Sequence, residues 1–210
     1  MTMRQIFAGV LLAIASLGTA SAAATQTQTF ASPTEFLQDH DARVRAIILR
    51  DPTDSLSTGE REQVRTLINE AFDFRELSRQ SLGDIWETRT DEERDEFVQV
   101  YRGIIERRNL DMFVRYHREG GIAYTGQEIA ADGRAVVLAE VPVKKETKII
   151  SYSLYRPLAD GQWRIYDLIV DGAGTVDGNR RAWTRFISRN SYEKLLERLR
   201  QQLASLEEAG

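Results

Sequence analysis

The second half of the chain holds four β-rich segments that are separated by turns too short to contain a helix. In chain order after Gly120 and Gly121 they are IAYTGQEI, RAVVLAEVPV, TKIISYSLY and QWRIYDLIV. Turn-forming residues at 132–133, 144–146 and 159–161 separate them. Parallel neighbours need a crossover of a dozen or more residues. The segments are therefore predicted to form a four-stranded antiparallel sheet.

Helices are predicted both before and after these four strands in the sequence. Ser32, Ser57 and Thr90 are each followed three residues later by glutamate, which is the capping-box pattern of a helix start. Apolar residues then recur at helical spacing. Residues 72–86 read as a short helix that is broken near Gly83, and two more helices follow residue 180. The predicted fold class is α+β in one domain: N-terminal helices, the sheet, then C-terminal helices.

The first 22 residues have the pattern of a secretory signal peptide. Arg4 provides a positive charge, residues 6–17 are an apolar run, and Ala20-Ser21-Ala22 is a small-x-small cleavage pattern. The apolar run is too short for a comfortable membrane span. We expect a signal peptide at 1–22, a single domain at 23–210, and a location beyond the inner membrane, in the periplasm.

Composition excludes several classes of function. The chain has no cysteine, which excludes disulfides, thiolate metal sites, cysteine nucleophiles and a lipoprotein anchor. Its net charge is -4, so the protein as a whole is not a polyanion binder, and we expect no nucleic-acid partner.

The stretch DGAGTVDGNR, residues 171–180, resembles a phosphate-binding loop at first sight. Gly172, Gly174 and Gly178 come close to the G-x-G-x-x-G pattern, but three residues rather than two separate the last pair. The preceding strand is also the last of four antiparallel ones, not the first of a βαβ unit. We interpret the stretch as a corner between the sheet and the closing helices, at the rim of a pocket.

Few residues are suited to catalysis. His40 and His117 lie in arginine-rich helical surroundings without a metal-binding partner pattern, and we interpret them as solvent-side or helix-end residues. Asp167 is a charge within an apolar strand. It can serve as a structural partner for an arginine or a backbone donor, which we favour, or as a buried general base. We expect no cofactor and no metal.

The predicted strands are apolar on both alternating faces. A sheet of this kind is covered on both faces, or lines a cavity on one of them. Periodicity alone does not decide between the two.

Residues 72–105, FDFRELSRQSLGDIWETRTDEERDEFVQVYRGII, resemble the opening signature of the toluene-tolerance family, the MlaC-type periplasmic phospholipid-binding proteins. The strand ISYSLY, the segment GQWRIYDLIVDG and an arginine-containing helix from about Arg180 follow in the family's order, so the resemblance covers about residues 36–203. The chain departs from the family pattern at two places: Ala173-Gly174-Thr175 and Gly178-Asn179-Arg180.

The resemblance implies a cone-like α+β fold, related to nuclear-transport-factor-like domains, with an apolar cavity between sheet and helices. It implies a carrier that shuttles phospholipid between the outer and inner membranes and maintains outer-membrane lipid asymmetry. The implied partners are an inner-membrane ABC transporter with an MCE-domain protein and an outer-membrane lipoprotein–porin complex. It implies neither catalytic residues nor a cofactor, and we expect a monomer.

On this interpretation the acyl chains lie against apolar residues of the helices and the sheet: Phe74, Leu77, Leu82, Phe97, Tyr101, Ile104, Ile105, Ile150, Tyr152, Leu154, Tyr166, Leu168 and Val170. Two other hypotheses stay open. One is a small-molecule enzyme on the same fold with Asp167 as base, and the other is a periplasmic interaction module with a packed interior and no ligand.

Overall fold

The computed structural model describes residues 30–50, 55–158 and 161–208. The predicted signal peptide, residues 1–22, lies outside the described residues.

Five helices come first: α1 (Pro33–Ile48), α2 (Thr58–Ala71), α3 (Phe74–Leu82), α4 (Asp84–Glu87) and α5 (Asp91–Glu119). The strands are β1 (Ala123–Ile129), β2 (Arg134–Val143), β3 (Glu146–Tyr155), β4 (Arg164–Val170) and β5 (Ala173–Gly174). Helices α6 (Thr175–Arg189) and α7 (Tyr192–Glu208) follow. The α+β prediction is confirmed.

The predicted helix starts are confirmed with their caps. Ser32, Ser57 and Thr90 each accept a backbone N–H of the first turn, and the glutamate three residues on accepts the N–H of the capping residue. Each box satisfies two N–H groups that the helix itself cannot satisfy. Gly83, in a left-handed conformation, separates α3 from α4 as predicted.

The sheet is an antiparallel meander in the order β1-β2-β3-β4-β5. The prediction of four strands is therefore wrong by one. The additional strand, β5, is only two residues long and pairs with the end of β4. Two residues are too few to show a strand's alternating pattern, so the sequence gives no signal for β5.

Only one face of β2 and β3 is covered by helices. The inner-face residues of β2 are almost completely buried: Ala135, Val137, Ala139 and Val141. The intervening Val136 and Leu138 are 40 % and 43 % exposed, and Ile149 of β3 is 46 % exposed. We expected both faces to be covered, or one to line a cavity. The outer face differs because the cross-strand neighbours of Leu138 are Gly126 and Ser151, which leave the apolar residues scattered rather than contiguous.

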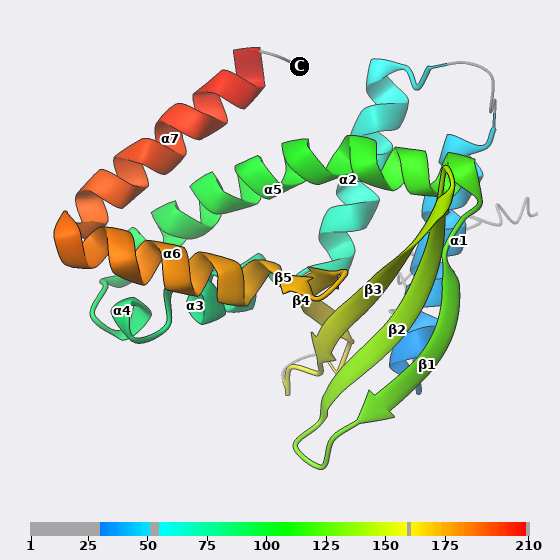
Figure 1. Ribbon diagram of the computed structural model, residues 1–210, viewed down its shortest axis with the longest axis horizontal. Helices are drawn as coiled ribbons and strands as arrows, with labels where there is room; N and C mark the ends of the chain where they lie inside the picture. The colour runs from blue at the N-terminus through cyan, green and yellow to red at the C-terminus, as the bar shows by residue number, and fades with distance from the viewer. Residues whose placement is uncertain (1–29, 51–54, 159–160, 209–210) are drawn as a thin grey trace, which may run out of the picture.

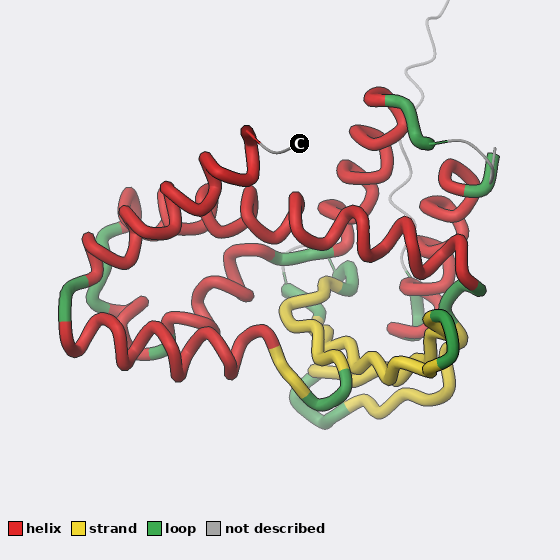
Figure 2. The backbone as a smooth tube through the Cα atoms, turned by 45° about the horizontal axis from the view of Figure 1, so that its top comes forward, coloured by secondary structure: helices red, strands yellow, loops and turns green. Residues whose placement is uncertain are grey.

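Helix α5 connects two halves of the molecule (Figure 1). Its N-terminal part packs with α3 and α7, and its C-terminal part packs with α1, α2 and β2. Its buried residues lie along the whole helix, from Phe97 to His117. Figure 2 shows the strands gathered under one half of the molecule, with α6 leading from the last strand into the other half.

Among the described residues, no helix is sufficiently long and apolar to cross a bilayer.

The pair Gly120–Gly121 allows the change from α5 to the sheet. Gly121 has φ +81°, and its amide donates to the carbonyl of Tyr116 at 3.0 Å, which closes the helix. A Cβ on Gly121 would lie 2.5 Å from Nη1 of Arg45. The position therefore favours glycine for its backbone angle, whereas the Arg45 contact is with the end of a flexible side chain that can move.

We predict that Gly121→Ala lowers the free energy of unfolding by about 1 to 2 kcal/mol, because an alanine in a left-handed backbone costs roughly that much. Gly133→Ala is the matched control, since Gly133 has φ +82° but nothing within 4 Å of its Cβ position. Urea denaturation should show similar losses in the two variants, because the Arg45 guanidinium can move away from the new methyl group. A clearly larger loss in Gly121→Ala would show that Arg45 is held in place.

Candidate functional site

Two hollows on the surface of the described structure have the size of ligand pockets. One, of about 440 Å³, lies between α2 and α5, and charged side chains such as Arg65, Arg102 and Glu106 line it. These charges pair with carboxylates or arginines nearby, as in Arg65–Glu62 and Arg102–Glu106. The other, of about 380 Å³, lies between α5, β5, α6 and α7, and we call it the α5–α6 groove.

The α5–α6 groove is lined by both apolar and polar side chains. Its apolar residues are Tyr101, Ile104, Ile105, Trp183 and Leu199. Its polar residues are Arg108, Asn109, Thr175, Asn179 and Gln202. A ligand with both an apolar and a charged part would find partners for each in such a groove.

Tyr101 and Arg108 are two different kinds of lining residue in the α5–α6 groove: Tyr101 is buried and Arg108 is exposed. The side-chain amide of Asn179 donates to the Tyr101 hydroxyl, and burial raises the pKa of Tyr101, so this tyrosine stays neutral. No carboxylate among the described residues pairs with Arg108. Its Nη2 lies 2.8 Å from the Gln202 side-chain oxygen, in the orientation in which that oxygen accepts. The groove thus combines buried neutral side chains with one exposed cation that no carboxylate neutralises.

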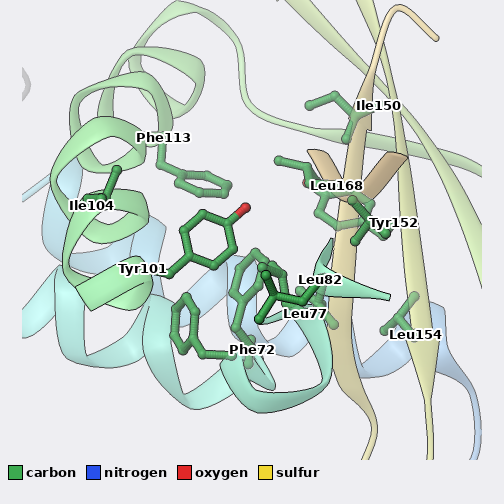
Figure 3. Close-up of a cluster of buried hydrophobic side chains, with 14 of the residues drawn as sticks. Phe72, Leu77, Leu82, Tyr101, Ile104, Phe113, Ile150, Tyr152, Leu154 and Leu168 are labelled. Atoms are coloured by element: carbon green, nitrogen blue, oxygen red, sulfur yellow. The ribbon is translucent and has the colours of Figure 1, made fainter. Parts of the chain in front are cut away.

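A buried apolar cluster lies behind the α5–α6 groove. Figure 3 shows Tyr101, Ile104 and Phe113 of α5 facing Ile150, Tyr152 and Leu168 of the sheet, with the Tyr101 hydroxyl pointing toward the strands. Most residues of the predicted lipid-binding set belong to this one core: Phe74, Leu77, Leu82, Phe97, Tyr101, Ile104, Ile150, Tyr152, Leu154 and Leu168, with Ile105 and Val170 packed against it.

Tyr166 lies apart from this cluster, because a β-bulge interrupts β4. Leu168 pairs with Tyr152 and Ile165 pairs with Leu154, so both point to the inner face although three residues separate them. Tyr166 packs edge-on against Tyr155, and the guanidinium of Arg134 lies over its ring. The prediction that Tyr166 shares a face with Leu168 is wrong, because strict alternation does not hold across the extra residue.

The stretch 171–180 contributes one wall of the α5–α6 groove but is not a single loop. Asp171 and Gly172 form the turn, Ala173 and Gly174 form β5, and α6 begins at Thr175. The expected corner is therefore shorter than predicted, and Gly178 to Arg180 are helical. Arg180 fastens this end of α6 to α3, where its Nε donates to the carbonyl of Gln80 at 2.8 Å.

Sequence analysis missed the polar residues of the groove. Arg108 and Asn109 lie four residues after Ile104 and Ile105 on α5, and therefore on the same helix face. This spacing could have predicted that Arg108 and Asn109 lie beside the apolar residues of the groove. No comparable pattern in the sequence points to Gln202 and Trp183, because only the packing of α7 and α6 brings them to the groove.

A second, smaller cavity lies between α1, α5 and the inner face of the sheet. It has a volume of about 30 Å³, and we call it the inner cavity. Apolar residues including Leu37, Phe72 and Tyr152 line it, together with His40, Asp41 and His117, which we call the His–Asp cluster. An apolar cavity is thus present between sheet and helices as expected, but most of the interior is filled by side chains.

The interpretation of the two histidines as solvent-side or helix-end residues is partly right. His117 is a helix-end residue, in the last turn of α5, but it is only 3 % exposed, with Nε2 at 3.3 Å from Oδ1 of Asp41. His40 lies within α1 and is half-buried. Burial lowers the pKa of His117 to about 4, and Arg45 adds to this. Burial lowers the pKa of His40 to about 4, with contributions from Arg43 and His117. Burial raises the pKa of Asp41 to about 6, against the effect of Arg45.

Asp167 has the structural role that we favoured. It is 7 % exposed, and its Oδ1 accepts the backbone N–H groups of Leu168 at 2.9 Å and Val176 at 3.1 Å. It therefore caps the start of α6 from the neighbouring strand, where Gly174 offers no side chain. Burial raises the pKa of Asp167 and is opposed by these hydrogen bonds.

We predict that Asp167→Ala lowers the free energy of unfolding by about 1 to 3 kcal/mol, because it leaves buried N–H groups unsatisfied. Asp167→Asn is the matched control: both bonds go to Oδ1, and an asparagine oxygen can accept both. Urea denaturation compares the two. An equal loss in both variants would contradict the capping role.

We also predict that stability falls as the pH falls from 6.5 toward 4. The unfolded His117 binds a proton near pH 6.5 and the folded one only near 4, so protons favour the unfolded state in this range. Asp41 acts in the opposite sense and offsets part of the loss. Wild type should lose about 2 kcal/mol more than His117→Gln between pH 7 and pH 4.5, measured by urea denaturation. An equal loss would refute the assignment to His117.

Comparison with known proteins places this arrangement in a family. Residues 38–201 match the family described as MlaC protein. No curated protein matches the chain. Seven chains of solved structures match, and one of them is the phospholipid-binding protein from Ralstonia solanacearum, solved in complex with a phospholipid. That structure has a TM-score of 0.70 and 21 % identity over 82 % of this chain and 97 % of the other, which shows a shared fold. Since the family match spans well over half of the sequence, the chain belongs to the MlaC family.

Proposed function

We propose that this protein binds phospholipid acyl chains and carries the lipid through the periplasm, between the outer and inner membranes. The observation that carries the proposal is the α5–α6 groove, a hollow of about 380 Å³ lined by both apolar and polar side chains, whose residues Tyr101 and Ile104 belong to the main apolar cluster. Family membership and the phospholipid complex of the Ralstonia protein support it.

The energetics of lipid transfer suit such a protein. Each buried CH₂ contributes about 0.8 kcal/mol, so two acyl chains with ~30 methylenes cost on the order of 24 kcal/mol to expose to water. Transfer from a bilayer into an apolar pocket is nearly neutral in this respect. Small differences at docking are then sufficient to decide between loading and release.

Loading requires the apolar cluster to part. Beside the α5–α6 groove lies a hollow of about 200 Å³ between α6 and α7, which shares Trp183, Leu199 and Gln202 with it. The voids between α5 and the sheet side of the molecule are small, at about 30 Å³ for the inner cavity and about 10 Å³ for the space beside Ile105 and Leu110. On our proposal the chains enter at Tyr101 and Ile104 and displace side chains between α5 and the sheet. The phosphate then lies at the exposed Arg108, which supplies the positive charge.

The proposed partners are those of the family: an inner-membrane ABC transporter with an MCE-domain protein and an outer-membrane lipoprotein–porin complex. The carrier between them would act as a monomer in the service of outer-membrane lipid asymmetry. Its signal-peptide pattern at residues 1–22 supports this location.

An enzymatic function has less support. The candidate base Asp167 is occupied with two backbone N–H groups, and its contacts hold α6 in place. No cluster of three or more potential metal-binding side chains occurs in the described part of the chain. Family membership also favours a binding protein over an enzyme.

The first test is to extract purified protein and identify the bound lipid by mass spectrometry. We expect phospholipid to be recovered in a fixed ratio to protein. Lipid-free protein that also takes up no lipid from vesicles would refute the proposal and favour the interaction module.

The second test fills the groove. Gly178 lies on the groove wall within α6 and has nothing within 4 Å of its Cβ position. We predict that Gly178→Trp lowers lipid uptake from vesicles by tenfold or more without loss of stability, because its side chain occupies the groove and glycine is a poor helix former.

The matched control for this test is Gly59→Trp. Gly59 is also in the first turns of a helix with open space at its Cβ position, but it is exposed and far from the groove in α2. Lipid uptake by Gly59→Trp should equal that of the wild-type protein. Equal uptake by the two variants would mean that the α5–α6 groove is not the entrance.

A further inference from the structure

The His–Asp cluster is not explained by binding of plain acyl chains. It lies in an apolar surrounding between α1 and α5, opposite Tyr124 and Tyr152 of the sheet. A site for hydrocarbon alone needs no polar group there, and burying one has a cost. The cluster therefore indicates something other than a methylene chain at this depth.

Two ring nitrogens of the cluster have no hydrogen-bond partner among the described residues: Nε2 of His40 and Nδ1 of His117. Oδ1 of Asp41 makes no hydrogen bond that meets the geometric criteria, although it lies 3.3 Å from Nε2 of His117. A buried polar atom without a partner destabilises the fold, and native proteins rarely keep several together without a function.

The inner cavity and the α5–α6 groove are separate, and a third small void with shared lining residues lies between them. Ile68 and Phe72 line both the inner cavity and the small void beside Leu110. Ile105 and Asn109 line both that void and the α5–α6 groove. Few side chains therefore separate the groove from the His–Asp cluster, and a chain that enters at the groove and displaces them reaches the cluster with its buried end.

We propose that the inner cavity receives a hydroxyl group carried on the buried acyl portion of the ligand, so that the preferred ligand is a lipid with a hydroxylated chain. The inference rests on the proposed lipid-binding function and specifies its substrate class. A hydroxyl both donates and accepts a hydrogen bond, so it can satisfy a histidine nitrogen in either tautomer and the Asp41 oxygen as well.

The charge state of the cluster fits a neutral polar group better than an ion. Burial keeps both histidines uncharged at neutral pH, since their pKa values are about 4. Asp41, Tyr124 and Tyr152 line the cavity with them, and Arg43 and Arg45 of α1 are near enough to lower the pKa of His40 and of His117, respectively. Burial raises the pKa of both tyrosines, so these groups are neutral as well.

The volume of the inner cavity, about 30 Å³, suits a hydroxyl or about two water molecules, and not a bulkier polar group.

The test offers vesicles that contain equal amounts of a distearoyl phospholipid and its hydroxystearoyl counterpart, in a series with the hydroxyl at mid-chain positions and at the chain end. The lipids bound to the purified protein are then counted by mass spectrometry. We expect at least one member of the series to be taken up about fivefold over the plain lipid, the factor that one net hydrogen bond supplies.

His117→Phe should abolish this preference while plain lipid is still bound. His40→Leu is the second variant, because its Nε2 has no partner and its loss breaks no existing bond at that atom. Arg115→Gln is the control: Arg115 is exposed on the same helix, and the variant should keep the full preference.

The outcomes separate this inference from the proposed function. Equal uptake of plain and hydroxylated lipids by wild type would overturn the inference, and the cavity would then hold water only, while lipid binding would stand. A preference that persists in both histidine variants would also overturn it. If neither lipid is bound, the proposed function fails, and this inference fails with it.

Discussion

The structure depends on the burial of α5 along its whole length and on more than one side. The helix has no single apolar stripe: Phe97 packs with Trp183 and Tyr192 in one half of the molecule, whereas Phe113 and Tyr116 belong to the half that contains the sheet. A helix that is apolar around much of its surface has to be covered by several partners. Here α3 and α7 cover one end, and α1, α2 and β2 cover the other.

The α5–α6 groove follows from this double packing. The two halves meet at the middle of α5, near Ile104 and Ile105, where the chain passes from β4 through β5 into α6. Asp167 determines the direction of α6 there, because it holds the first N–H groups of the helix from within the sheet. The apolar cluster lies behind the groove and the His–Asp cluster lies at its far end, so polarity varies along the proposed path of a ligand.

Much of the fold could be predicted from local rules. The capping boxes at Ser32, Ser57 and Thr90 and the break at Gly83 are local hydrogen-bond or backbone requirements, and the structure confirms them. The failures have two causes. The bulge at Tyr166 and the burial of His117 arise from contacts between different elements, which periodicity does not record. Strand β5 pairs with the nearby end of β4 but is too short to show a periodic pattern. The candidate site was predictable where its residues are apolar and regularly spaced, as at Tyr101, Ile104 and Ile105.

The sequence by itself determined the antiparallel order of the strands, since turns of two or three residues permit no crossover, and it determined the helix starts through their caps. It also supplied a surplus of apolar residues and hardly any suited to catalysis. Only the tertiary structure decided which of those residues form core and which form a groove. It placed Arg108 beside Gln202, and it brought the half-buried His40 and Asp41 to one cavity with the buried His117. The physical reason is that a hollow is a property of how elements pack, and the packing of α7 on α5 and of α1 on the sheet is not encoded in any one segment.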